Sequence, residues 1–316
     1  MQRTIIIGSP GMLTTVQDRG RYGFQRFGMP VTGAADLISM QLANLLVGND
    51  PGLAVLEATL SGPEVRFTGR GLVAFCGGGM RPLLNGAVVP AYRAVEVKEG
   101  DRLGFEPSDK GCRGYIAFDG GVDVQQVMGS RSTCLRSGTG GWEGRPLREG
   151  ETIPLGEKRG KPRVTELPEG LVPGYGTPAM LRILPGPEIR RLAFDGLKNL
   201  MNEDYLVGAD SDRMGYRLQG EPIRLNEQGH EIISAGIVFG TIQVPPNGQP
   251  IVMLADRQTT GGYARIATVA TVDHSLLAQL RPGDTVSFCE VSHEEARSLY
   301  LNSESFTYFR LPGHNR

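Results

Sequence analysis

The sequence predicts a mainly β protein with a few helices, arranged as two lobes that are related by an internal repeat. Three observations lead to this prediction. The 316 residues include 45 glycines and 21 prolines, which is typical of many short strands joined by turns. The chain is longer than one hydrophobic core usually serves, so two domains are expected. Several segments of the first half also recur, in the same order, in the second half.

The charge and cysteine content exclude several classes of function. With 33 basic and 34 acidic residues the net charge is −1, so electrostatics favours neither nucleic acid nor an anionic membrane as a partner. The cysteines Cys76, Cys112, Cys134 and Cys289 form no C-x-x-C pair, which argues against a zinc site and favours a reducing compartment. No segment approaches 18 consecutive apolar residues. We therefore expect a cytoplasmic protein without a metal site.

The first half contains the expected strands and one helix. The helix is predicted over residues 35–47, from apolar residues in helical spacing, with Thr32 as its cap and Gly48 just beyond its end. Asp36 would lie in its first turn, where the helix dipole favours an acid. Strands are predicted over residues 3–7, 65–67, 72–76, 94–97, 102–105 and 114–118.

Three consecutive glycines, Gly77 to Gly79, follow one of these strands. A glycine-rich loop can cradle phosphates, but no Lys-Ser/Thr pair follows and the surrounding pattern is not β-α-β, so this is not a P-loop. We expect a bulge or a close backbone contact instead.

The internal repeat consists of three pairs of segments. Residues 60–67 are echoed by 218–225, Asn85-Gly86 by Asn247-Gly248, and residues 99–105 by 282–288. We therefore expect an N-terminal lobe over residues 1–110 and a C-terminal lobe over 180–316. The glycine-rich and proline-rich segment 111–179 would connect them, with Trp142 as an anchor for its glycines. In the second lobe, helices are expected to start at His274 and His293, capped by Asp273 and Ser292.

The strongest candidate for a functional site is the stretch 243–263. A buried strand is predicted over residues 251–255, and Asp256, Arg257, Gln258, Thr259 and Tyr263 follow it, with Gly261-Gly262 among them. Glycine permits close backbone approach, and a rigid strand would place these polar groups accurately around a small polar ligand. A polar turn between two strands is the alternative.

Three further motifs combine acids, arginines and glycines. Residues 14–23 include Asp18 and Arg21, residues 136–145 include Arg136 and Ser137, and residues 211–218 include Asp212 and Arg213. For the first motif, a ligand-facing role and a salt-bridged structural turn are both open. Arginine binds carboxylates bidentately and a buried carboxylate can act on an amide proton, so this set suits a small amide or lactam that carries a carboxylate.

Four stretches resemble the signature segments of the family of 5-oxoprolinase C subunits, in the same order along the chain: 13–23, 138–145, 211–218 and 243–263. This family is also described as allophanate hydrolase subunit 2-like or biotin-dependent carboxyltransferase-like. The resemblance runs from about residue 10 to residue 290. It implies two cyclophilin-like β-barrel lobes with a cleft where they meet, to which segment 111–179 would contribute.

The resemblance also implies a function. It implies the C subunit of an ATP-dependent 5-oxoprolinase that opens 5-oxoproline to glutamate together with A and B subunits. The chain has no recognisable ATP motif, so ATP is expected to be bound with or by the partner subunits. One alternative is a biotin-dependent carboxyltransferase of the urea carboxylase type, although no biotinyl-lysine segment such as Ala-Met-Lys-Met exists here. Another is a non-catalytic antagonist that binds a kinase-inhibitor protein.

The site residues expected on these grounds fall into two groups. Asp256, Arg257 and Asp18 are expected to be catalytic, with Arg257 on a substrate carboxylate and Asp256 on the amide proton. The substrate-binding residues are expected to be Arg21, Arg136, Ser137, Asp212, Arg213, Gln258, Thr259, Gly261, Gly262 and Tyr263.

Overall fold

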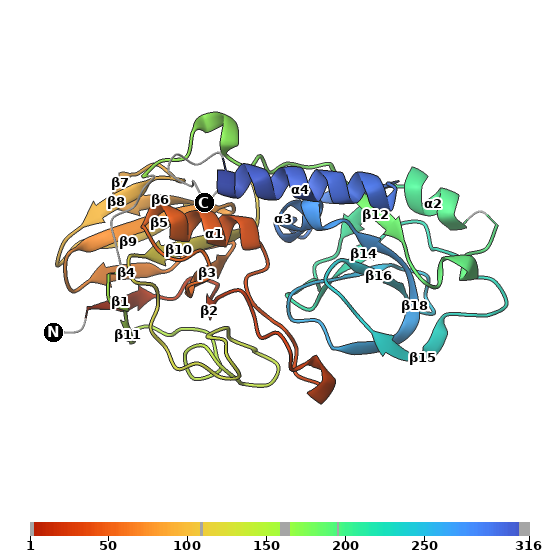
Figure 1. Cartoon of the computed structure of the whole chain (residues 1–316), viewed down its shortest axis with the longest axis horizontal. Helices are drawn as coiled ribbons and strands as arrows, with labels where there is room; N and C mark the ends of the chain where they lie inside the picture. The colour runs from red at the N-terminus through yellow and green to blue at the C-terminus, as the bar shows by residue number, and fades with distance from the viewer. Residues whose placement is uncertain (1–2, 108–109, 159–164, 195, 310–316) are drawn as a thin grey trace. The chain divides into compact units, whose positions relative to one another are not determined.

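The structure is a computed structural model that describes residues 3–107, 110–158, 165–194 and 196–309. These residues form two compact units (Figure 1). Of the described residues, unit 1 comprises those within 3–22, 32–175 and 307–309, and unit 2 comprises those within 23–31 and 176–306. Strands dominate the described residues, which also contain four α-helices. The prediction of a mainly β protein with a few helices is therefore confirmed.

Unit 1 contains two open antiparallel sheets. The first has the order β11-β1-β4-β9-β6-β7 and the second the order β2-β3-β10-β5-β8. The strands of the first sheet are β1 (Thr4–Ser9), β4 (Glu64–Phe67), β6 (Met80–Leu84), β7 (Ala87–Val88), β9 (Arg102–Pro107) and β11 (Thr152–Pro154). Those of the second are β2 (Leu13–Gln17), β3 (Val55–Thr59), β5 (Gly71–Gly77), β8 (Ala94–Val97) and β10 (Arg113–Phe118).

The barrel expected for the first lobe is therefore not a single closed ring. Consecutive strands change sheets at glycines with positive φ, at Gly11 between β1 and β2 and at Gly77, the last residue of β5. Each change of sheet breaks the ladder that a continuous barrel would need. One hydrophobic cluster includes residues of both sheets, such as Ile5 and Val65 of the first and Leu56 and Ile116 of the second. The two sheets thus share one core.

Helix α1 (Leu37–Leu46) contacts β5 and β10 of the second sheet, and both supply residues to a second apolar cluster. Its N-cap is Asp36, whose carboxylate accepts a hydrogen bond from the Ser39 amide at 3.0 Å. The predicted cap, Thr32, was wrong, because its backbone is left-handed (φ 57°) and its hydroxyl accepts a hydrogen bond from Arg21. Gly48, with φ 78°, follows the C-terminus as predicted.

The glycine triplet after β5 makes the close backbone contact that was expected. A Cβ atom on Gly77 would lie 2.3 Å from the carbonyl oxygen of Arg113. The amides of the triplet donate to Tyr92 Oη, to the Arg113 carbonyl and to the Lys110 carbonyl. All three N–H groups therefore have protein acceptors, and none remains to bind a phosphate.

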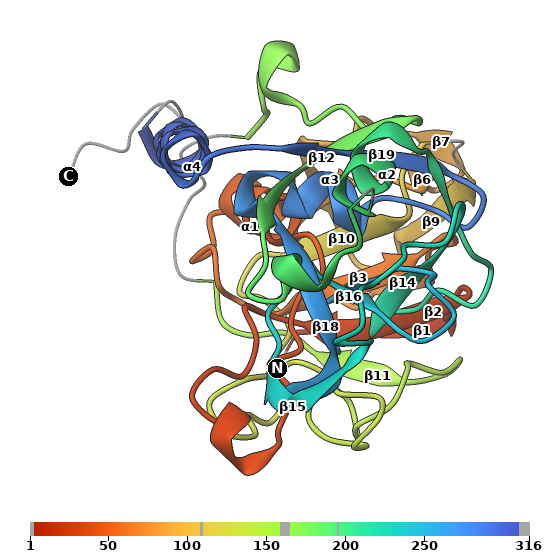
Figure 2. The same cartoon turned by 90° about the vertical axis from the view of Figure 1, so that its right-hand side faces the viewer.

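Unit 2 is built around a closed seven-stranded barrel with the order β12-β19-β13-β14-β17-β16-β18, closed by pairing of β12 with β18. Its strands are β12 (Ala179–Pro185), β13 (Tyr205–Val207), β14 (Gly215–Gln219), β16 (Thr241–Val244), β17 (Ile251–Met253), β18 (Thr260–Val269) and β19 (Thr285–Glu290). Only the pairing of β12 with β19 is parallel among these strands. An eighth strand, β15 (Glu231–Gly236), lies outside the ring and pairs with β18 (Figure 2).

The remaining helices are α2 (Gly196–Asn202), α3 (His274–Ala278) and α4 (His293–Phe309), with short 3-10 turns η1 (Gln25–Phe27), η2 (Glu169–Leu171), η3 (Ile189–Arg191) and η4 (Thr271–Asp273). Ser292 caps α4 as predicted, since its hydroxyl accepts the Glu295 amide at 3.1 Å. Asp273 does not cap α3 with its side chain. Its carboxylate instead binds the amide and guanidinium of Arg182, which removes it from the helix end.

One echoed segment pair adopts the same turn in both units. In unit 1 the Lys98 amide donates to the Asp101 carboxylate at 2.9 Å, and in unit 2 the Arg281 amide donates to the Asp284 carboxylate at 2.8 Å. The glycine within each turn, Gly100 or Gly283, has a positive φ. The repeat in sequence therefore corresponds to a repeated local structure that leads into β9 in one unit and β19 in the other.

Candidate functional site

The strand that leads to Asp256 is shorter than predicted. β17 ends at Met253, Ala255 and Asp256 lie in a turn, and β18 begins at Thr260. The alternation of side chains along a strand therefore no longer decides which way Asp256 and Arg257 point. Their directions follow from their contacts.

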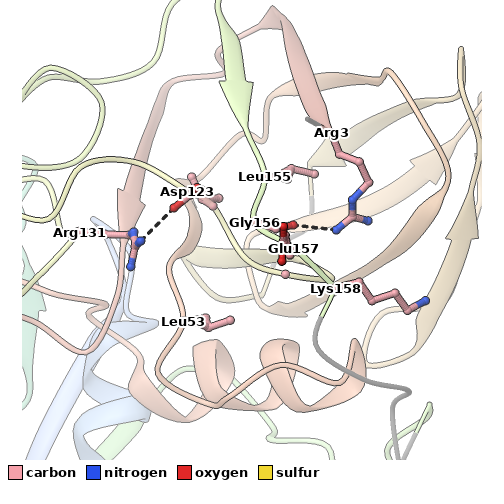
Figure 3. A pocket seen from close by; sticks show the side chains of 10 residues that line it. Arg3, Leu53, Asp123, Arg131, Leu155, Gly156, Glu157 and Lys158 are labelled. Atoms are coloured by element: carbon pink, nitrogen blue, oxygen red, sulfur yellow. Dashed lines mark hydrogen bonds and ion pairs between the residues drawn. The ribbon is translucent and has the colours of Figure 1, made fainter. Parts of the chain in front are cut away.

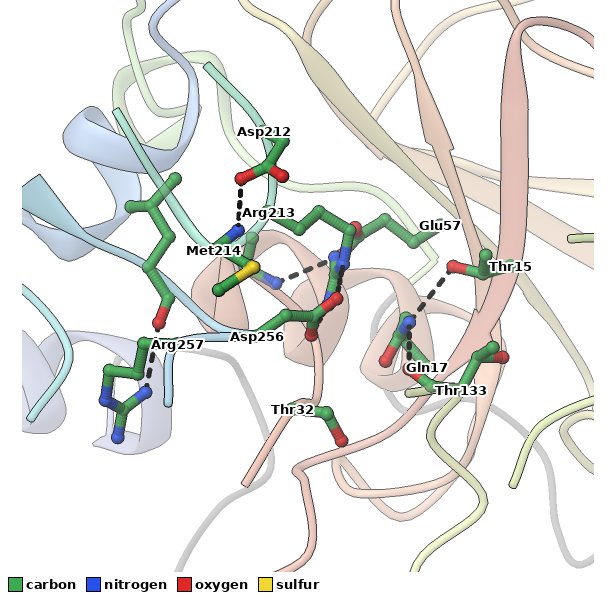
Figure 4. Close-up of polar contacts among 12 residues, drawn as sticks. Thr15, Gln17, Thr32, Glu57, Thr133, Asp212, Arg213, Met214, Asp256 and Arg257 are labelled. Atoms are coloured by element: carbon green, nitrogen blue, oxygen red, sulfur yellow. Dashed lines mark hydrogen bonds and ion pairs between the residues drawn. The ribbon is translucent and has the colours of Figure 1, made fainter. Parts of the chain in front are cut away.

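Asp256 forms a bidentate ion pair with Arg213 (Figure 4). Arg213 Nε and Nη2 donate to the two carboxylate oxygens at 3.0 and 3.1 Å, and both side chains are 5% exposed. The Asp256 amide also donates to the Arg213 carbonyl at 2.8 Å. Two of the predicted site residues are thus joined through both backbone and side chain, in the planar fork geometry that arginine offers to carboxylates.

Arg257 takes a different direction from Asp256 (Figure 4). Its guanidinium donates to the carbonyl oxygens of Leu254 at 3.1 Å and Ile237 at 3.3 Å. These contacts clamp the turn to the segment that follows β15. The geometry therefore favours a structural role for Arg257, and its expected contact with a substrate carboxylate stays a prediction.

The other predicted residues near Asp256 differ in exposure. Gln258 and Thr259 are half-buried and Tyr263 is exposed. A Cβ atom on Gly261 would lie 2.4 Å from Ile237 Cδ1, so the absence of a side chain at this position leaves room for the Ile237 side chain. A Cβ atom on Gly262 would make only ordinary van der Waals contacts. Asp212 is exposed and its carboxylate accepts the Met214 amide at 2.7 Å, which shapes the turn that contains Arg213.

In unit 1, Asp18 lies at the centre of a hydrogen-bond network. Its carboxylate accepts four hydrogen bonds, from the amides of Gly20 and Arg131 and the hydroxyls of Ser130 and Ser132, at 2.5 to 2.8 Å. This arrangement ties the first motif to residues 130–132. Of the two roles left open for Asp18, the contacts favour the structural one.

Arg21 is fully buried in the same region. Its guanidinium donates to the carbonyl oxygens of Val127 and Ser132 at 3.0 and 2.8 Å, and to the Thr32 hydroxyl at 3.2 Å. A Cβ atom on Gly140 would lie 2.5 Å from Arg21 Nη2, which explains a glycine at that position. Arg21 therefore joins three chain segments of unit 1.

Arg136 and Ser137 are exposed, in a turn between Cys134 and Thr139, which form an isolated β-bridge. Trp142 packs against the core shared by the two sheets, as expected of an anchor.

Gln17 and Thr133 were not predicted as site residues, and they are buried and hydrogen-bonded to each other. β2 reads Leu-Thr-Thr-Val-Gln, so a further polar residue at its end gave no local signal that could have identified Gln17.

His274, which lies within electrostatic range of Arg257, is neutral near pH 7. Burial, with a contribution from the Arg257 charge, lowers its pKa from 6.5 to about 4. Its Nε2 lies 3.2 Å from the Val269 carbonyl oxygen, and its ring packs on Phe239 with centroids 4.5 Å apart. The charge of Asp273, the preceding residue, opposes the lowering of this pKa.

Protonation of His274 is expected to destabilise the folded chain in acid. The folded pKa lies below the unfolded one, so the unfolded state binds the extra proton, and stability is complete above pH 6.5 and falls between pH 6.5 and about 4. The loss attributable to this histidine is roughly 3 kcal/mol. Urea unfolding at pH 7 and pH 4.5 measures it by comparing the wild type with His274→Gln, which cannot titrate. Equal pH dependence in both proteins would contradict the assignment.

Unit 1 also has a surface cavity of about 840 Å³, lined by Arg3, Leu53, Gly120, Val122, Asp123, Arg131, Leu155, Gly156, Glu157 and Lys158 (Figure 3). Arg131 is paired with Asp123, and Arg3 and Lys158 with Asp119. The charges around it are thus largely compensated, and none of the predicted site residues lines it.

Within the described residues no group of three His, Cys, Asp or Glu side chains could hold a metal ion. In the same part of the chain, no helix is long and apolar enough to cross a membrane.

Comparison with known proteins identifies the family. A family model described as the carboxyltransferase domain, subdomain A and B, matches residues 27–290. The chain is 40% identical to the 5-oxoprolinase C subunit of Escherichia coli (strain K12), over 95% of this chain and 94% of that protein. It is 35% identical to the 5-oxoprolinase C subunit of Haemophilus influenzae, over 92% of this chain and 93% of that protein.

A solved structure shares the fold along nearly the whole chain. The crystal structure of the K. lactis urea amidolyase superposes with a TM-score of 0.92 at 29% identity, covering 97% of this chain and 20% of that much longer chain. The chain therefore belongs to the carboxyltransferase family of subdomains A and B, and within it to the group of 5-oxoprolinase C subunits.

Proposed function

We propose that the chain is the C subunit of an ATP-dependent 5-oxoprolinase and opens 5-oxoproline to glutamate together with A and B subunits. The observation that carries this proposal is the 40% identity to the 5-oxoprolinase C subunit of Escherichia coli across nearly the full length of both proteins. The chemistry of the site agrees with it, because the pair of Arg213 and Asp256 supplies a buried, oriented carboxylate, a group that can act on an amide proton.

In this proposal the Asp256 carboxylate takes part in proton transfer at the lactam nitrogen, and Arg213 holds that carboxylate in place through the fork. Arg257 and Asp18, which were expected to be catalytic, contribute by holding their turns. Six of the residues predicted to bind substrate are proposed to contact substrate or another chain of the complex: Arg136, Ser137, Asp212, Gln258, Thr259 and Tyr263. We also infer that the two units derive from one duplicated, cyclophilin-like ancestor.

We assign ATP to the partner subunits. The glycine triplet Gly77 to Gly79 is the stretch that suggested a phosphate loop, and its three amides already have acceptors within the chain. It therefore does not fit a nucleotide phosphate. The four cysteines are free thiols, which fits a protein of the cytoplasm, a reducing compartment.

The purified chain alone is expected not to hydrolyse 5-oxoproline, whereas addition of the cognate A and B subunits is expected to produce glutamate in an ATP-dependent reaction. Glutamate is measured by an enzyme-coupled assay. Reactions that lack ATP, or lack each of the other chains in turn, serve as controls. Glutamate formation by this chain alone with ATP would overturn the shared-complex proposal.

The likeness to the K. lactis urea amidolyase supports a second function, carboxyl transfer from biotin to a urea nitrogen. This function needs a biotin carrier from another chain. A reconstituted mixture that consumes urea and carboxylated carrier, but not 5-oxoproline, would favour it over the first.

A further inference from the structure

Residues 21–32 form a loop whose two ends are held together in unit 1. The Ala34 amide donates to the Asp18 carbonyl oxygen at 2.9 Å, which joins the segments on either side of the loop. Arg21, which is fully buried, donates from Nη1 to the Thr32 hydroxyl at 3.2 Å. Compact surface loops with closed ends frequently carry function, so the contents of the 21–32 loop are informative.

The tip of the 21–32 loop, which belongs to unit 2, is folded by its own hydrogen bonds. It contains the 3-10 turn η1 (Figure 1), in which the Phe27 amide donates to the Phe24 carbonyl oxygen at 2.9 Å. The Gly23 amide donates to the side-chain oxygen of Gln25, also at 2.9 Å. The tip therefore has a definite conformation before any partner binds, which lowers the entropy that binding costs.

The loop is uncovered although it is aromatic. Phe27 is 68% exposed, and Tyr22, near the start of the loop, is 62% exposed. A Cβ atom on Gly23 or Gly28 would have no neighbour within 4 Å apart from the adjoining residues, so there is open space before and after η1. Large exposed aromatic side chains gathered on one short loop are typical of a surface that contacts another molecule.

The tip also carries one positive charge. Arg26 is the only charged residue between positions 22 and 31. Its guanidinium carbon lies 4.7 Å from the centroid of the Phe27 ring, in a cation–π contact. Arg26 is exposed and forms no ion pair within the part of the chain that the structure describes. Phenylalanine and arginine are both enriched at protein interfaces, and together they suit an apolar pocket with a carboxylate at its edge.

We propose that the tip of the 21–32 loop docks into a partner subunit of the 5-oxoprolinase complex, with the Phe27 ring in an apolar pocket and Arg26 paired with a carboxylate beside it. This inference rests on the proposed function, which requires A and B subunits. A second copy of this chain fits less well, because the cavity in unit 1 is lined mostly by charged residues and glycines. A membrane surface also fits less well, because attraction to anionic lipids takes a cluster of basic residues.

The test measures the binding of this chain to purified A and B subunits, singly and together, by surface plasmon resonance, which requires no turnover. Phe27→Ala is expected to weaken binding by about 30-fold or more, the usual loss when an interface anchor is truncated. Arg26→Gln is expected to slow association and to reduce its dependence on salt. Phe194→Ala, which removes an exposed phenylalanine outside the loop, is the matched control and should retain the wild-type affinity.

The outcomes separate the docking proposal from the proposed function. Equal affinity of the wild type and folded Phe27→Ala would overturn the docking proposal alone, whereas a wild type that binds neither subunit overturns both. A complex that forms through the loop but does not open 5-oxoproline contradicts only the proposed function.

Two further measurements examine the other occupants, namely sedimentation of the chain by itself and flotation with vesicles that contain phosphatidylserine. Self-association or vesicle binding that Phe27→Ala abolishes, with subunit binding unchanged, would assign the loop to a second copy or to a lipid surface and would overturn the docking proposal.

Discussion

Asp256→Asn is expected to lower the turnover of the reconstituted complex by about 10²–10⁴-fold, the usual cost of removing a general acid or base. The asparagine has the same shape but lacks the charge and cannot accept from both nitrogens of Arg213. Because the pair is buried, loss of the charge is also expected to destabilise the chain by about 3–5 kcal/mol. Glutamate formation and urea unfolding measure the two effects separately.

Two variants control this experiment. Asp210→Asn breaks an ion pair with Arg217 in which both side chains are more than half exposed, so its stability should change by less than about 1 kcal/mol. Arg257→Lys tests the competing assignment, since a lysine cannot reproduce the planar fork on two carbonyl oxygens. Near-normal turnover in folded Asp256→Asn, with a large loss in folded Arg257→Lys, would transfer the catalytic role to Arg257.

Asp18→Ala is expected to have the largest effect on unit 1. It removes the acceptor of four hydrogen bonds and leaves the amides of Gly20 and Arg131 without this acceptor. Hydrogen bonds to a charged group contribute about 1.5–3 kcal/mol each and are not additive, so a total loss of roughly 3 kcal/mol or more is expected. Urea unfolding measures the loss, and amide hydrogen exchange should accelerate at Arg131.

Glu106→Ala is the matched control for Asp18→Ala. Glu106 is paired with Arg81 at the surface, where both side chains are more than two-fifths exposed, and its loss should cost less than about 1 kcal/mol. Unchanged stability and unchanged exchange at Arg131 in Asp18→Ala would show that the carboxylate does not organise residues 130–132, and would make Asp18 a candidate catalytic residue again.

Six of the eleven strands described in unit 1 were predicted from local sequence, because short apolar runs between turn residues define them independently of their partners. The way the strands close was not predictable. The barrel of unit 2 depends on β12 pairing with both β18 and β19, which lie about 80 to 110 residues further along the chain. Unit 1 contains strands of the same kind, yet its glycines distribute them over two sheets.

The candidate site was predictable as a set of residues but not as a set of contacts. Asp256, Arg213 and Asp18 were identified because acids and arginines beside glycines are chemically informative. Which arginine pairs with Asp256 depends on a turn that the strand pattern did not reveal. Gln17 was missed because its buried hydrogen bond is to Thr133, 116 residues away, and a neutral side chain in a strand carries little local signal.

The position of β15 outside the ring affects how the protein behaves at high concentration. A closed ring exposes no strand edge, so the free backbone groups of this barrel's sheet are concentrated on β15, where Ile233 is 95% exposed. Such an edge can pair with a strand of another molecule and start aggregation. The irregular register between Glu231 and Ala235 interrupts the strand, so that only a short stretch is flat enough to serve as a template. The flat part of this edge is therefore confined to the few residues of β15 on either side of the irregularity.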